Sequence, residues 1–99
     1  MAPVRESAVP TVQTDNERVK VTEWRFAPGA ETGWHRHEYD YVIVPLTSGK
    51  LLLETSDGSS VSELTSGKSY FRLTGVEHNV INGSDTEFAF VEIEIKGDR

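Results

Sequence analysis

"EFAFVEIEIK" (residues 87–96) alternates between two kinds of side chain, residue by residue. One set is aliphatic: Ala89, Val91, Ile93 and Ile95. The other set is aromatic and then acidic: Phe88, Phe90, Glu92 and Glu94. Successive side chains of a β-strand point to opposite faces of the sheet, so a period of two predicts a strand with two different faces.

The rest of the chain shows the same kind of pattern in short pieces. Stretches rich in β-branched and aromatic residues, each bounded by Gly, Pro, Asn, Asp or Ser, cover 18–26, 40–47, 50–55, 60–65, 69–73 and 78–81. Asp57-Gly58 between two of them is a strong hairpin signal. No stretch sustains a helical stripe. The sequence therefore predicts an all-β sandwich or barrel over residues 16–99, preceded by an extended N-terminal arm over residues 1–15.

Length and composition limit the classes of function. A chain of 99 residues has room for one domain. It has no apolar run that could span a bilayer and no apolar signal-peptide core near its start, so we expect a cytoplasmic protein that is not bound to a membrane. The net charge is −6 without a basic block, which argues against nucleic-acid binding. We therefore expect a small-molecule or metal site.

The stretch "GWHRHEYDYV" (33–42) contains two of the three histidines of the chain. In a strand His35 and His37 face the same way, with Arg36 on the other side. Such a pair can chelate a metal, or it can be two exposed histidines on a polar surface. The third histidine, His78, follows the turn at Gly75 and begins a predicted strand.

Two motifs that contain these histidines resemble those of the cupin family. The pattern G-x5-H-x-H-x4-E-x6-G is matched at Gly29, His35, His37 and Gly49, and G-x5-P-x-G-x2-H-x3-N is matched at Gly67, Gly75, His78 and Asn82. The resemblance implies a single-domain jelly-roll β-barrel. It also implies that His35, His37 and His78 bind one divalent metal ion, for which iron, zinc, nickel, manganese and copper are all candidates.

The phrases "GWHRHEYDYVIVPLT" and "GVEHNVIN" are similar to those of small cupins labelled β-alanine degradation proteins. This resemblance implies a small carboxylate or aldehyde metabolite as the ligand, and we expect that ligand to be anionic. The label implies no reaction, whereas the resemblance to cupins in general implies a metal-dependent oxygenase, isomerase or decarboxylase. The alternative is a cupin that binds a metabolite or a metal without turnover.

Two positions of the motifs differ from the family pattern. Leu73 replaces the proline, and the glutamate is replaced by Val42, or by Tyr41 if the spacer is one residue shorter. Val42 cannot bind a metal, whereas Tyr41 shares the strand face of His35 and His37. Tyr41 is thus a candidate fourth ligand or, as we expect, an aromatic residue of the barrel wall beside a three-histidine site.

Several further residues are candidates for defined roles. Arg25 could bind a substrate carboxylate at the barrel mouth, or it could be a solvated arginine on the outer face. The aromatic residues Trp34, Phe71, Phe88 and Phe90 are expected in the core or the barrel lining. We also expect a homodimer, because a barrel of this size buries a limited core. The arm and the strand 18–26 are the candidates to pair with the partner's sheet edge.

Overall fold

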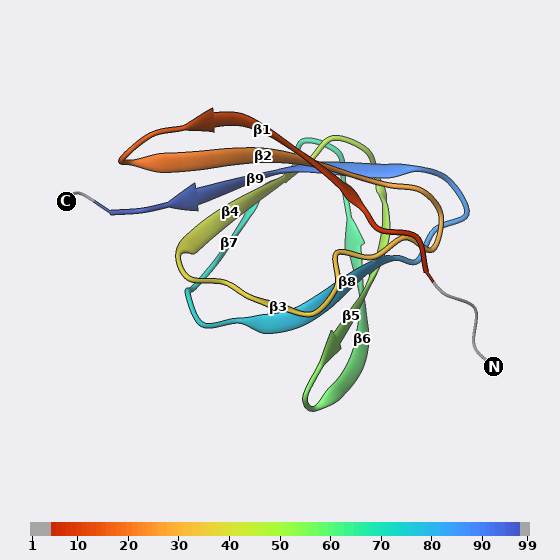
Figure 1. The fold of residues 1–99 in the computed structure, drawn as a ribbon. Helices are drawn as coiled ribbons and strands as arrows, with labels where there is room; N and C mark the ends of the chain where they lie inside the picture. Colours follow the sequence, from red (N-terminus) through yellow and green to blue (C-terminus); the bar gives the residue numbers. More distant parts are fainter. Residues whose placement is uncertain (1–4, 98–99) are drawn as a thin grey trace.

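Two antiparallel β-sheets face each other in the computed structural model, which describes residues 5–97 (Figure 1). The strands are β1 (Val9–Asp15), β2 (Val19–Phe26), β3 (His35–Arg36), β4 (Asp40–Pro45), β5 (Gly49–Thr55), β6 (Gly58–Leu64), β7 (Tyr70–Arg72), β8 (Glu77–Asn82) and β9 (Phe88–Ile95). One sheet has the order β1-β2-β9-β4-β7 and the other β3-β8-β5-β6. Within residues 5–97 there is no helix long and apolar enough to cross a membrane. The all-β prediction is confirmed.

Every second side chain along each inner strand of the five-stranded sheet points toward the interior of the barrel. Glu92 of β9 is the cross-strand neighbour of Ile43 on β4 and of Thr22 on β2. Along β4, buried side chains alternate with half-buried ones from Asp40 to Pro45. The aromatic and acidic set of β9 is therefore the inward set, and the aliphatic set faces outward.

An aromatic core closes one end of the barrel. The ring centroid of Phe26 lies 6.4 Å from that of Phe88 and 5.4 Å from that of Phe90, and all three side chains are buried. Gly49, the second glycine of the first motif, leaves room for this core, because a Cβ at this position would lie 2.8 Å from the Phe88 ring. Since the core fills only this end, the other end stays open for a cavity.

Part of the expected extended N-terminal arm forms a strand of the five-stranded sheet. Residues 9–15 form strand β1, which pairs with β2, and Ala8 just before it is buried. Every side chain of β1 is exposed, so the strand has no inward set that would produce a sequence pattern. Pro10 is tolerated because β1 is an edge strand. Residues 1–4 of the predicted arm and 98–99 of the predicted barrel lie outside the described residues.

This arrangement also changes the expected edge of the sheet. Strand β2, which covers most of 18–26, is flanked by β1 and β9 and is not an edge in the described part of the chain.

The predicted core aromatics divide into two groups. Phe88 and Phe90 are buried, whereas Trp34 is 55% exposed and Phe71 is 49% exposed. Phe71 is exposed because it lies on the outer face of the edge strand β7.

Candidate metal centre

The three histidines converge on one point of the inner wall. His35 on β3 and His78 on β8 are cross-strand neighbours, and His37 lies directly after β3. The backbone N–H of His37 donates to the carbonyl of Val76 at 2.9 Å, which holds this segment against the start of β8. As a result, Nε2 of His37 lies 3.0 Å from Nε2 of His35 and 3.0 Å from Nε2 of His78.

The tautomer of His35 follows from its neighbours. Its Nδ1 lies 2.8 Å from the carbonyl oxygen of Gly33 and 3.2 Å from Oγ1 of Thr32. A carbonyl oxygen can only accept, so Nδ1 carries the proton and donates it. The Nε2 of a neutral His35 therefore presents a lone pair to the other two imidazoles, as a metal ligand requires.

Burial keeps the other two imidazoles neutral near pH 7. It lowers the pKa of His37 to about 3, an effect to which the charges of His35 and His78 add. It likewise lowers the pKa of His78 to about 4. A neutral imidazole nitrogen offers one proton or one lone pair, so Nε2 of His37 can form a hydrogen bond in only one of its two contacts.

A cation at the point of convergence would satisfy all three nitrogens together. Ligand atoms of His35, His37 and His78 all lie within 4.8 Å of one another. Two imidazole nitrogens that bind one ion at about 2.0–2.1 Å are themselves within about 4 Å, and both 3.0 Å contacts meet this condition. The donor set thus fits a divalent metal ion. Imidazole suits zinc, copper, iron and nickel alike, so it does not select among them.

The histidines open onto a cavity of about 650 Å³ between the two sheets. This volume is within the range of about 300–1,000 Å³ that is usual for small-molecule sites. The apolar and aromatic wall consists of Trp24, Tyr39, Tyr41, Ile43, Leu51, Leu53, Tyr70, Val76, Val80 and Phe90. Charged side chains also line the cavity: Asp15, Lys20, Arg36, Glu38, Arg72, Glu92, Glu94 and Lys96.

Glu92 is a candidate functional residue that the sequence analysis did not identify. Glu92 is 9% exposed, and its carboxyl group accepts a hydrogen bond from Nε1 of Trp24 at 3.4 Å. Burial and, to a smaller extent, the charge of the neighbouring Glu94 raise the pKa of Glu92 to about 7. Its Oε2 lies 3.7 Å from Nδ1 of His37. Since His37 is neutral near pH 7, this contact is not an ion pair there.

Tyr41 and Val42 lie on opposite faces of β4. Tyr41 is 3% exposed, and its ring stacks on that of His37 with centroids 3.9 Å apart. Burial raises the pKa of the Tyr41 hydroxyl, which disfavours the phenolate that would bind a metal. Val42 lies on the outer face between Phe71 and Ile93. The inward position next to the histidines is therefore occupied by an aromatic ring.

The structure does not bring Arg25 to the cavity. Trp24 and Phe26 face inward along β2, so Arg25 between them faces outward. Its guanidinium donates to Glu23 at 2.8 Å and to Glu87 at 3.2 Å. The solvated alternative thus describes its position, and an arginine that does line the cavity is Arg72 on β7.

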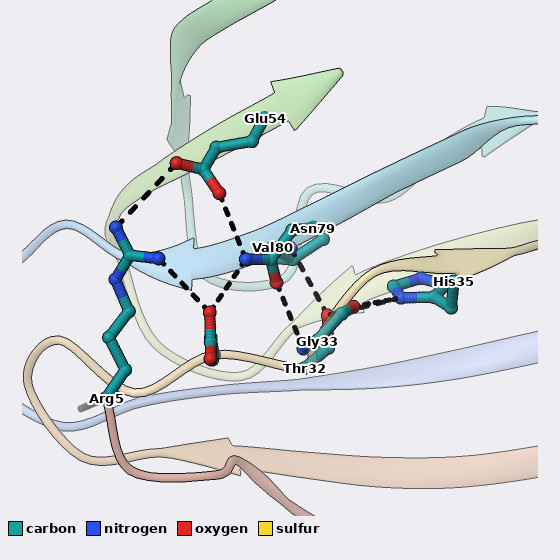
Figure 2. A network of polar contacts seen from close by, with 8 residues as sticks. Arg5, Thr32, Gly33, His35, Glu54, Asn79 and Val80 are labelled. Carbon is teal, nitrogen blue, oxygen red and sulfur yellow. Dashed lines mark hydrogen bonds and ion pairs between the residues drawn. The ribbon is translucent and has the colours of Figure 1, made fainter. Parts of the chain in front are cut away.

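A polar network outside the barrel fixes the segment that precedes His35 in the chain (Figure 2). Asn79 accepts a hydrogen bond from the backbone N–H of Gly33 at 3.0 Å and donates to Glu31 at 2.7 Å and to Glu54 at 3.1 Å. Arg5 pairs with both of these carboxylates. The network therefore connects the N-terminal segment to the residue whose carbonyl orients His35.

The fold and the site define a class of protein: a small antiparallel barrel with a three-imidazole cluster on its inner wall. Residues 22–94 match the family model described as "Cupin domain". The chain therefore belongs to the cupin family.

Known relatives agree with this assignment. The chain is 66% identical to the "Beta-alanine degradation protein BauB" of Pseudomonas aeruginosa, over 93% of this chain and 97% of that protein. It is 71% identical to a cupin domain of known crystal structure from Bordetella pertussis, with a TM-score of 0.94 over 97% of this chain and 100% of that one. A Klebsiella pneumoniae protein with a double-stranded β-helix domain is 21% identical, with a TM-score of 0.77 over 98% and 84% of the two chains, and shares the fold.

Proposed function

We propose that this cupin is a metal-dependent enzyme that acts on a small carboxylate-type metabolite. The observation that carries the proposal is the convergence of three imidazole Nε2 atoms on the wall of a cavity, with His37 at 3.0 Å from both other histidines. The ion would be divalent, with iron, zinc, nickel, manganese and copper as candidates. His35, His37 and His78 would hold it.

The bound ion would supply Lewis-acid chemistry or, if it is redox-active, chemistry with oxygen. The residues of the chain provide the surroundings for such a reaction. Gly33 orients the imidazole of His35, and Tyr41 supports the ring of His37. Glu92 places a carboxyl group in the same cavity, where it can take up or release a proton.

The class of substrate is supported by the relative from Pseudomonas aeruginosa, whose name refers to β-alanine degradation. A sequence identity of 66% over nearly the whole of both chains supports a related role in amino-acid or β-alanine catabolism. The reaction would be that of an oxygenase, an isomerase or a decarboxylase. We further propose a cytoplasmic location, which suits an enzyme of catabolism.

A cupin that captures a metabolite without turnover is the alternative. The aliphatic and aromatic part of the cavity wall favours it, since such side chains bind ligands but perform no chemistry. The enzyme is favoured by Glu92, because a buried carboxyl group inside a cavity is costly unless it serves a function.

Metal analysis followed by a metabolite screen tests the proposal. The protein is purified without added metals, its metal content is measured, and it is then loaded with each candidate ion. Each form is incubated with β-alanine and related short carboxylates and aldehydes, and the products are identified by mass spectrometry. We expect stoichiometric metal and turnover with one ion. Metal that binds with the same affinity after all three histidines are replaced by alanine would overturn the proposed site, and binding without turnover by every form would favour the alternative.

A further inference from the structure

Two arginines that line the cavity, Arg36 and Arg72, form no ion pair within residues 5–97. Arg36 lies on the face of β3 opposite His35, so Arg72 is the arginine on the inward face. Arg72 on β7 is the cross-strand neighbour of Tyr41, and the Tyr41 ring stacks on His37. Within residues 5–97, Arg72 forms no ion pair, whereas Arg5 and Arg25 each pair with two carboxylates. Its charge is thus available to a ligand.

The guanidinium is held in place by neutral groups. Its central carbon lies 4.5 Å from the centroid of the Tyr70 ring, and Nη1 donates to the backbone carbonyl of Phe71 at 3.0 Å. A cation stacked on an aromatic face loses little freedom on binding an anion. The remaining N–H groups form part of the planar fork that matches a carboxylate.

The other charges of the same row do not offer this. The inward row of the five-stranded sheet runs across Lys20, Glu94, Tyr41 and Arg72 as successive cross-strand neighbours. Lys20 has the oppositely charged Glu94 as its cross-strand neighbour. Arg72 lies beyond Tyr41, on the side of the row away from Glu94.

We propose that Arg72 binds the carboxylate of the ligand, so that the rest of the ligand extends past Tyr41 toward the three histidines. This inference rests on the proposed function and deepens it, because it assigns the substrate carboxylate to a protein side chain. The cavity of about 650 Å³ corresponds to about twenty water molecules, far more than a three-carbon amino acid fills. The cavity therefore has room beside Arg72 for a carboxylate that also carries an apolar body.

Calorimetric titration with 3-phenylpropionate tests the assignment. This probe has a carboxylate and an apolar body, and 3-phenylpropionamide is its uncharged counterpart. The proteins are the wild type, Arg72→Gln and Arg25→Gln, each purified with its metal and analysed for metal content. Arg25→Gln is the matched control, because it removes the same charge from the outer face of β2.

We expect Arg72→Gln to weaken binding of the carboxylate by about tenfold or more, since a charge-assisted bond is lost. Arg25→Gln is expected to change it by less than about twofold. The amide is expected to bind both variants as it binds the wild type, which shows that the cavity is intact. Equal carboxylate affinity in Arg72→Gln and wild type would overturn the inference, as would a wild type that binds the carboxylate no better than the amide.

The two proposals fail in different ways. A wild type that binds no metal would overturn the metal-dependent enzyme, and the loss of carboxylate affinity in Arg72→Gln would still support the anchor. Stoichiometric metal together with an unaffected carboxylate affinity in Arg72→Gln would remove the anchor alone.

Discussion

The side-chain oxygen of Asn79 accepts a hydrogen bond from the backbone N–H of Gly33 at 3.0 Å (Figure 2). The carbonyl of the same Gly33 lies 2.8 Å from Nδ1 of His35. Asn79 is the residue after His78, and its side chain points to the other side of β8. One strand therefore supplies a histidine of the cluster from its inner face and the support for a second histidine from its outer face.

We expect Asn79→Ala to lower both stability and metal affinity. The substitution leaves the N–H of Gly33 without its acceptor and removes the amide donor of Glu31 and Glu54, which keep only Arg5, and this costs about 1–3 kcal/mol of the free energy of unfolding. The looser support of His35 should weaken metal binding by about tenfold or more. Urea unfolding of the metal-free protein and a metal titration measure the two effects.

The control for Asn79 is the exposed end of the same network. Arg5→Ala removes two ion pairs of partly exposed groups and should cost less than about 1 kcal/mol, with unchanged metal affinity. Equal losses of metal affinity in Arg5→Ala and Asn79→Ala would contradict a specific role of Asn79 in holding His35.

Replacement of His78 by alanine should weaken metal binding strongly, because it removes one of three converging nitrogens. The matched control is Glu77→Ala at the exposed neighbouring position, which should bind metal as the wild type does. Metal content after dialysis and a competition titration with a chelator measure the difference. Stoichiometric metal at wild-type affinity in His78→Ala would show that the cluster is not the metal site.

The metal-free protein should lose stability as the pH falls from about 6.5 toward 4.5. The folded-state pKa values of His37 and His78, about 3 and about 4, lie below the value of 6.5 for an unperturbed imidazole. In this window the unfolded chain binds protons at both residues and the folded chain does not. The free energy of unfolding therefore decreases as the pH decreases. Urea unfolding at several pH values measures the slope.

The protonation of Glu92 has the opposite effect on how the free energy of unfolding depends on pH. Its folded-state pKa of about 7 lies above the ordinary 4.5, so the folded chain binds a proton there that the unfolded chain does not. This contribution is present below about pH 4.5 and is lost as the pH rises through 7. The variant Glu92→Gln lacks it, and its stability should therefore fall more steeply with decreasing pH than that of the wild type. An equal slope would contradict the raised pKa of Glu92.

The sequence predicted what local patterns determine and missed what distant segments determine together. The alternation over 87–96 predicted a strand, and β9 covers Phe88–Ile95. The same alternation could not show which set faces inward, because that depends on the strands packed around β9. Glu92 is far from His37 in sequence and meets it only across the barrel. Strand β1 escaped prediction because an exposed edge strand needs no apolar set.

We propose that two copies associate through the outer face of the five-stranded sheet. A row of apolar neighbours, Val21, Ile93, Val42 and Phe71, crosses β2, β9, β4 and β7 on that face. An antiparallel sheet that faces water on one side normally carries polar residues there. Ile93→Asp should therefore shift the protein from dimer to monomer in sedimentation at micromolar concentration. The control Val61→Asp, at a position 63% exposed on the other sheet, should not. A wild type that sediments as a monomer would exclude the dimer.

The last prediction concerns the position that is a glutamate in the family pattern. Tyr41 faces the cluster and Val42 faces away from it, and the raised pKa of the Tyr41 hydroxyl argues against a bound phenolate. Tyr41→Phe keeps the ring that stacks on His37, so metal affinity should stay within about twofold of the wild type. Tyr41→Ala removes the ring and should weaken metal binding, because His37 loses its support. Val42→Glu places a carboxylate on the outer face, so it should leave metal affinity unchanged and disturb association instead.

Metal titrations of the three variants distinguish the arrangements. A loss of affinity in Tyr41→Phe would identify the hydroxyl as a ligand, and a gain in Val42→Glu would mean that this residue turns inward. Unchanged affinity in both, with a loss in Tyr41→Ala alone, is the result expected for a centre with three histidine ligands and an aromatic wall.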